Sequence, residues 1–285
     1  MAKAKTAAVN LLDFDQEAIK AREREVAKES DESIITRIKE RFEILEDMTK
    51  GVKKGDVRAM IVSGPPGVGK SFGVEAVLTK DDLFDKLGER KPRYEIVKGA
   101  MSAIGLYSKL YEFSKKGSVL VFDDCDSILM EDLSLNILKA ALDSSKKRTI
   151  SWNTDSRVLR HEGIPNSFEF SGSAIFITNI KFEHVRSKKL RDHLDALESR
   201  CHYLDLTIDT NREKILRIKQ IVQDGMLDVY DLEQIAKDEV VQFIEANADK
   251  MRELSLRMVI KIADLRTSMP LKWKTVAAMT CMKRA

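Results

Sequence analysis

The chain has 285 residues, and its apolar fraction of 43% is sufficient for a folded core and excludes a disordered chain. Basic and acidic residues nearly balance, and a formal net charge of +3 does not by itself predict nucleic-acid binding. The three cysteines are widely spaced, no apolar run approaches the ~18 residues of a membrane helix, and the amino terminus lacks the apolar core of a signal peptide. We therefore expect a cytoplasmic protein without a disulfide framework or a membrane span.

A charged helical extension is the first predicted element and occupies residues 1–50. Apolar residues recur at helical spacing from Ile34 to Leu45, which indicates a helix that frays before Ser30. Two glycines, Gly51 and Gly55, then predict a break between this helix and the next element.

Apolar runs of strand length alternate with helical patterns in the next part of the chain. The runs lie at 59–63, 94–97, 118–122, 174–178 and 202–206, and the helical patterns at 71–78, 103–113 and 133–142. Continuous apolar runs are typical of buried parallel strands, which are connected through right-handed helical crossovers. The pattern predicts an α/β domain over residues 51–210, in which helices sandwich a parallel sheet.

Only helical patterns follow in residues 211–285. Pro270 interrupts them before a last helix around Trp273. We expect a small all-helical lid domain after the α/β domain.

A phosphate-binding pattern, G-x-x-x-x-G-K-[ST], lies between the first expected strand and the helix after it. Its residues are Gly64, Pro65, Pro66, Gly67, Val68, Gly69, Lys70 and Ser71, with Phe72 directly after them. Glycines let backbone N–H groups turn towards phosphate, and the helix contributes the positive end of its dipole. Lys70 is expected to reach the β- and γ-phosphates of ATP, and the Ser71 hydroxyl to bind Mg²⁺.

Two acids follow the apolar run at 118–122. Asp123 is expected to hold the Mg²⁺ ion through its water shell, and Asp124 to orient or deprotonate the attacking water. A strand followed by acids is weak evidence alone, but it is strong evidence after a phosphate loop in this order. Together the two motifs predict a Mg²⁺-dependent P-loop ATPase.

Five segments in chain order resemble the motifs of the AAA+ ATPase superfamily. They are residues 64–71, 122–128, 177–179, 197–201 and 255–257. The resemblance implies that Asn179 is the sensor 1 residue near the γ-phosphate, that Arg200 is an arginine finger acting on a neighbouring subunit, and that Arg257 is the sensor 2 arginine of the lid. It also implies a homo-oligomer, most often a hexameric ring. An ordinary role stays open for each residue, a surface ion pair for the arginines and a strand-end cap for Asn179.

The family usually has glutamate at the position of Asp124, so the turnover rate is in doubt. Superfamily 3 helicases and some viral AAA+ proteins also carry two aspartates, so Asp124 does not imply inactivation. A nucleotide switch that hydrolyses ATP poorly stays open, because a catalytic acid or base contributes ~10²–10⁴-fold to a rate.

A long insert, residues 143–173, reads as a strand, a polar turn and a second strand. It resembles the pre-sensor-1 hairpin of MoxR-type ATPases and superfamily 3 helicases. Its cations and its tryptophan suit phosphate contact and base stacking. The nucleic-acid candidates are Lys146, Lys147, Arg148, Trp152, Arg157 and Arg160. The alternative is a solvated basic loop with Trp152 packed in the core.

A second candidate for nucleic-acid contact is Lys98, in the segment 98–102, where AAA+ proteins carry a pore loop. Protein unfoldases usually place an aromatic residue there, and this segment has none. We therefore expect an ATP-driven motor or loader acting on DNA or RNA, in the style of a compact viral protein. The alternatives are a MoxR- or chaperone-like ATPase that remodels a protein partner, and a structural ring with little turnover.

Overall fold

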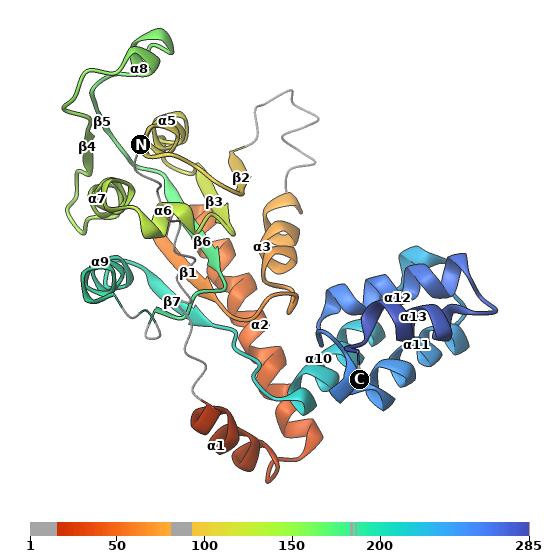
Figure 1. Ribbon diagram of the computed structural model, residues 1–285. Helices are drawn as coiled ribbons and strands as arrows, with labels where there is room; N and C mark the ends of the chain where they lie inside the picture. The colour runs from red at the N-terminus through yellow and green to blue at the C-terminus, as the bar shows by residue number, and fades with distance from the viewer. Residues whose placement is uncertain (1–15, 81–92, 183–184, 186, 285) are drawn as a thin grey trace, which may run out of the picture. The chain divides into compact units, whose positions relative to one another are not determined.

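The computed structural model describes residues 16–80, 93–182, 185 and 187–284 (Figure 1). Contacts between residues divide the described chain into two compact units. Of the described residues, the first unit comprises 46–63, 74–80, 93–182, 185 and 187–205, and the second comprises 17–45, 64–73 and 206–284. The units differ from the three predicted segments, because the amino-terminal helices and the phosphate motif group with the carboxyl-terminal helices.

A five-stranded parallel sheet forms the centre of the first unit. Its strands are β1 (Ala59–Ser63), β2 (Tyr94–Lys98), β3 (Val119–Asp123), β6 (Ser173–Thr178) and β7 (His202–Asp205), in the order β2-β3-β6-β1-β7. Every residue of β1, β3 and β6 is buried, which requires that both faces of the sheet are covered. The structure confirms the predicted α/β class with a parallel sheet between helices.

Three helices lie side by side on one face of this sheet. They are α5 (Ala103–Glu112), α7 (Asp132–Ala141) and α9 (Lys188–Glu198), and α7 contacts both of the others (Figure 1). Their apolar sides pack on alternate strand residues such as Ile61, Phe122 and Phe176, since a strand turns every second side chain to the same face. The short helix α6 (Ser127–Met130) directly precedes α7.

The strand register determines which residues share an edge of the sheet. Ser63 pairs with Thr178, and Asp123 pairs with Ile177, so β1, β3 and β6 end at the same carboxyl-terminal edge. At the opposite edge, Ala59 pairs with Ala174 and Val119 pairs with Ser173. Backbone polar groups and side chains of distant segments therefore meet at two separate edges.

The insert forms a short antiparallel hairpin of β4 (Thr149–Ser151) and β5 (Ser167–Glu169). The expected polar turn between the strands contains a helix, α8 (Arg157–His161), which Ser156 caps by accepting a hydrogen bond from the Leu159 N–H. The helix packs Leu159 into the core, where it is 1% exposed. This local burial explains why a turn was the wrong prediction for the segment.

Helices make up the second unit. They are α1 (Gln16–Val26), α2 (Asp31–Lys54, which continues into the first unit), α10 (Asn211–Gln223), α11 (Gln234–Ala246), α12 (Leu256–Ser268) and α13 (Trp273–Cys281), with α3 (Lys70–Thr79) beginning at the end of the phosphate motif. Two 3₁₀ turns, Asp228–Tyr230 and Ala248–Lys250, connect the carboxyl-terminal helices.

Pro270 lies between α12 and α13, as predicted. The predicted break at Gly51 is wrong, because α2 continues through it and ends before Gly55, whose φ of +80° terminates the helix.

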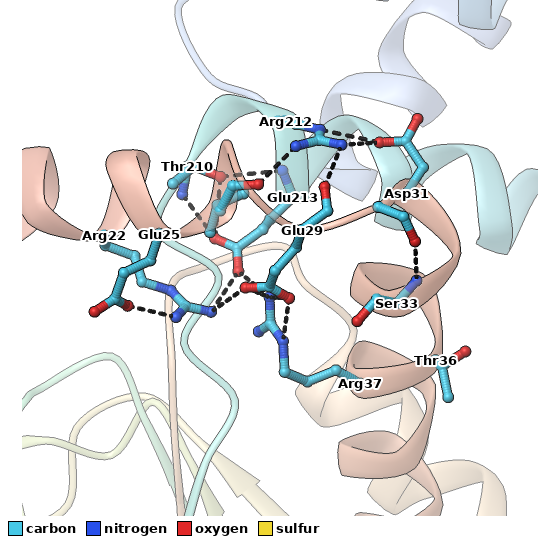
Figure 2. A network of polar contacts seen from close by, with 12 residues as sticks. Arg22, Glu25, Glu29, Asp31, Ser33, Thr36, Arg37, Thr210, Arg212 and Glu213 are labelled. Atoms are coloured by element: carbon cyan, nitrogen blue, oxygen red, sulfur yellow. Dashed lines mark hydrogen bonds and ion pairs between the residues drawn. The ribbon is translucent and has the colours of Figure 1, made fainter.

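A network of ion pairs fastens the turn between α1 and α2 to the first turn of α10 (Figure 2). Glu213 accepts hydrogen bonds from Arg22 at 3.1 Å and from Arg37 at 3.0 Å. Arg212 binds the Asp31 carboxylate and the carbonyl oxygens of Val26 and Glu29. These contacts explain why the amino-terminal helices belong to the second unit. Within the described residues, no helix has the length and apolar character needed to cross a membrane.

Candidate functional site

The phosphate motif of the second unit is a glycine loop that opens helix α3. Gly67 and Gly69 have φ angles of +72° and +104°, which other residues rarely adopt. A Cβ atom on Gly67 would also stand 2.6 Å from the Cβ atom of Ser255, so a side chain does not fit there. The amine of Lys70 is buried inside the loop and donates to the carbonyl oxygens of Gly64 at 2.6 Å and Pro65 at 2.9 Å.

The start of helix α12 rests on this loop. Leu256 donates its backbone N–H to the Gly67 carbonyl at 2.8 Å, and Ser255 caps the helix by accepting from the Met258 N–H. Arg257, the predicted sensor 2 arginine, directly follows Leu256 and is exposed. It therefore lies next in the chain to a residue that contacts the loop. Phe72 is 78% exposed on the first turn of α3.

Arg217 of α10 lies close to the same loop, although the sequence did not predict it as a site residue. Its guanidinium lies 3.6 Å from the centre of the Phe42 ring, and Nη2 is 3.9 Å from the position of a Cβ atom on Gly69. Nη1 donates to Gln220 at 3.0 Å, whereas Nε is buried without a hydrogen-bond partner. Burial lowers the pKa of Arg217 to about 10, so it stays a cation at neutral pH. The sequence of α10 predicts only an apolar stripe on one side of the helix, and this pattern does not indicate that an arginine of the same helix is buried.

The two predicted acids lie at the carboxyl-terminal edge of the sheet in the first unit. Asp123 is 5% exposed, and its Oδ2 atom lies 3.6 Å from the amine of Lys98. Asp124 has a φ of +53°, a left-handed conformation that costs a non-glycine residue about 1 kcal/mol or more. Its backbone N–H donates to the Ile177 carbonyl at 3.0 Å, and the Asn179 amide donates to its Oδ1 atom at 2.9 Å. The structure therefore brings the predicted acid and the predicted sensor 1 residue together.

A second polar contact joins the same two strands. Thr178 donates its hydroxyl to Asp126 at 2.7 Å and accepts the Ile180 N–H at 3.0 Å. Between these acids, burial and the charge of Asp123 raise the pKa of the Cys125 thiol to about 11, so the thiol is neutral. Asp126 and Thr178 were not predicted as site residues, because only the strand register shows that they meet.

Arg200 lies at the other edge of the sheet, between α9 and the first residue of β7. Strands rise about 3.3 Å per residue, so the two edges of this sheet are ~13–17 Å apart. The structure does not bring Arg200 to the acids of its own subunit, and its role as a finger for a neighbouring subunit stays a prediction.

The nucleic-acid candidates of the insert do not all lie on the exposed surface. Trp152 is 8% exposed, and its ring packs 5.6 Å from that of Tyr107 between ring centres, so it is not available for base stacking. Arg148 is half-buried and donates to the carbonyl oxygens of Ala141 and Gly172. The exposed candidates are Lys146, Lys147, Arg157 and Arg160, and Arg160 pairs with Asp155 at 3.1 Å.

The donor chemistry of Ser71 and Asp123 suits Mg²⁺, which prefers hard oxygen ligands and takes one or two protein carboxylates together with substrate phosphates. Among the residues that the structure describes, no group of three or more histidine, cysteine, aspartate or glutamate side chains could hold a metal ion by itself.

Comparisons with known proteins identify one similar curated protein. No family model matches the chain. The uncharacterized 36.7 kDa protein in the nrdC–mobD intergenic region of enterobacteria phage T4 is 34% identical over 268 residues, which cover 93% of this chain and 80% of that protein.

Similar solved structures share little sequence with this chain. The replication initiator DnaA bound to AMPPCP and single-stranded DNA is 14% identical (TM-score 0.45, 81% of this chain covered). NtrX from Brucella abortus in complex with ADP is 12% identical (TM-score 0.47, 85% covered), and a DNA replication initiation factor is 14% identical (TM-score 0.39, 82% covered). This chain spans only 61%, 51% and 63% of their respective lengths.

Proposed function

This chain belongs to the same family as the uncharacterized 36.7 kDa phage T4 protein, and we propose that it is an ATP-binding, Mg²⁺-dependent ATPase of the AAA+ type. The observation that carries the proposal is the glycine loop that opens α3, with left-handed Gly67 and Gly69 and the buried amine of Lys70. Such a loop presents backbone N–H groups, a helix amino terminus and a lysine to a polyphosphate.

The residues predicted to act on ATP have the following roles in this proposal. Lys70 exchanges the carbonyl oxygens of its own loop for the β- and γ-phosphates of ATP. Ser71 and Asp123 would hold Mg²⁺, which neutralises developing phosphate charge when it is bound. Asp124, held by Asn179, orients the attacking water and accepts its proton. The adjoining candidates are Phe72 and Arg257 for the nucleotide, and Arg200 for the nucleotide of a neighbouring subunit in a homo-oligomeric ring.

Replacing Lys70 with alanine should weaken ATP binding about 10- to 100-fold, which corresponds to ~1.5–3 kcal/mol for hydrogen bonds to a charged group. Lys80→Ala, which removes an exposed lysine just beyond the end of α3, is the matched control and should bind as the wild type does. Titration with a fluorescent ATP analogue measures both. Equal affinity for the two variants would sink the assignment of the loop.

We further propose that the ATPase acts on nucleic acid through its exposed basic residues. Single-stranded DNA should raise the ATPase rate several-fold, and moderate salt should abolish the rise, because phosphate contacts release counterions. Lys146→Ala with Lys147→Ala should reduce the stimulation, whereas Lys261→Ala with Lys272→Ala, two exposed lysines of the second unit, should not. ATPase assays over a salt series give the result.

The burial of Trp152 favours the second candidate function, which is remodelling of a protein partner, because the insert then lacks its stacking residue. An ATPase rate that ignores DNA at every salt concentration would exclude the nucleic-acid function and support this one.

A further inference from the structure

A basic pocket lies at the amino-terminal edge of the sheet in the first unit. Its volume is about 470 Å³, and its walls include the cations of Arg58, Lys116, Arg148 and Arg200. Among the described residues that line the pocket, Asp56 is the only acid. The lining residues Ala59, Ser173 and His202 begin β1, β6 and β7, so the pocket opens where three strands start.

Neutral carbonyl oxygens hold the three arginines in place. Arg148 donates from Nη1 to the Ala141 carbonyl at 3.0 Å and from Nη2 to the Gly172 carbonyl at 3.1 Å, and it lies over the Phe170 ring. Arg58 donates to the carbonyl of Asp143, and Arg200 to that of Ala196. These bonds fix the guanidinium groups without neutralising their charges. Each guanidinium has five N–H donors, so several remain for a ligand.

Nearby carboxylates act on the arginines of the pocket without forming ion pairs, namely Asp143 on Arg58 and Arg200, and Glu169 on Arg148. Within the described chain, none of the three arginines forms an ion pair with a carboxylate, and Arg200 Nε is buried without a hydrogen-bond partner. Burial, followed by the charge of Arg58, lowers the pKa of Arg148 to about 10. Three arginines line one pocket without an ion pair, and an anion bound among them would balance their charge.

The anion cannot be the nucleotide on the same subunit's catalytic edge. The pocket is at the start of the strands, whereas Asp123 and Asp124 are at their ends, ~13–17 Å away by strand rise. An arginine side chain anchored to local carbonyl oxygens does not cover that distance. The ligand therefore comes from outside the subunit.

We infer that Arg58, Arg148 and Arg200 together bind one phosphate group that another molecule supplies. Planar guanidinium forks match the oxygens of phosphate in pairs, and several forks around one cavity favour phosphate over a simple halide ion. The source is either the terminal phosphate of a nucleotide on a second copy of this chain or a backbone phosphate of nucleic acid. The first source rests on the proposed function, and it adds Arg58 and Arg148 to the single arginine expected from the sequence.

Tripolyphosphate titrated calorimetrically into the Lys70→Ala protein, without divalent cations, tests the pocket itself. Binding should occur, and Arg58→Gln with Arg148→Gln in that background should weaken it at least tenfold. Arg24→Gln with Arg252→Gln, two exposed arginines of the second unit, is the matched control and should have no effect. Absence of binding to the Lys70→Ala parent, or equal binding by all variants, would overturn the inference.

Because Arg148 is half-buried, its replacement could disturb folding. Lys116→Gln removes an exposed cation of the pocket wall and should weaken tripolyphosphate binding without changing thermal unfolding. If Lys116→Gln and the fully folded Arg148→Lys both bind as the parent does, the pocket is not a phosphate site.

Mixing experiments distinguish the two sources. Subunits with Arg58→Gln and Arg148→Gln, mixed with Lys70→Ala subunits, should regain ATPase activity if the phosphate belongs to a neighbour's nucleotide, because each copy supplies what the other lacks. If it belongs to nucleic acid, the pocket variant should instead lose oligonucleotide affinity and keep its ATPase rate. A wild-type protein that hydrolyses no ATP would refute the proposed function, while the tripolyphosphate titration would still decide on the pocket.

Discussion

Replacing Asp124 with asparagine should slow ATP hydrolysis by about 10²–10⁴-fold while leaving ATP binding close to that of the wild type. Asparagine has the same shape and tolerates the left-handed φ of +53°. It can also keep a contact with Asn179, but it cannot accept the proton of the attacking water. Single-turnover phosphate release measures the loss, and titration with a fluorescent ATP analogue checks binding.

Asp132→Asn provides a control for the loss of an acid elsewhere in the first unit. Asp132 begins α7, and its exposed carboxylate forms an ion pair with Lys189 of α9. Because this pair lies outside the proposed site, its loss should not change the rate of hydrolysis. Full activity of Asp124→Asn would show that another group accepts the proton. A wild-type protein already as slow as the variant would support the nucleotide-switch alternative.

Replacing Glu213 with alanine should reduce the free energy of unfolding by ~1–3 kcal/mol, the usual cost when a buried donor such as the Thr210 N–H loses its acceptor. The Glu213 side chain is 2% exposed and accepts from Arg22 and Arg37 (Figure 2). It also completes the capping box of α10 by accepting from Thr210. Urea unfolding followed by circular dichroism gives the change.

Glu25→Ala is the matched control, because Glu25 pairs with the same Arg22 but its side chain is 68% exposed. Exposed pairs contribute only ~0–1 kcal/mol. If the two variants lose equal stability, the network does not hold the amino-terminal helices in the way we describe.

The contribution of Glu213 should also depend on pH. Burial alone would raise its pKa, but the hydrogen bonds from Thr210, Arg37 and Arg22 together lower the pKa below its ordinary value. A lowered carboxyl pKa stabilises the fold above the ordinary value of about 4.3, and this stabilisation is lost as pH falls through the folded-state pKa. The stability difference between wild type and Glu213→Gln should therefore shrink in acid below about pH 4. A constant difference from pH 7 to pH 3 would contradict this account.

The strands and the phosphate loop could be predicted from the sequence because their signals are local. Buried parallel strands require continuous apolar runs, and the five predicted runs match the strands to within one residue at each end. The helix through Gly51 was missed because a glycine costs a helix only about 1 kcal/mol, which the packing of Val52 offsets. Helix α8 was missed because five residues carry too little periodicity to be distinguished from a turn.

Features that depend on contacts between residues far apart in the sequence could not be predicted from local patterns. Arg58, Arg148 and Arg200 are far apart in the sequence, and only the strand order brings them to one edge of the sheet. Trp152 looked suited to stacking on bases, but its environment depends on Tyr107, 45 positions earlier in the numbering. Motifs thus indicated which residues could act on ATP, whereas burial and register decided which cations are available for other ligands.

The most direct test of the central claim is the steady-state rate of phosphate release from ATP with Mg²⁺, measured for the wild type and for Lys70→Ala. We expect measurable turnover by the wild type and a rate more than about 100-fold lower for the variant, because the lysine is the main side-chain cation of the phosphate loop. Equal rates for the two proteins, or no turnover by a wild type that binds ATP, would contradict the assignment of this chain as an ATPase.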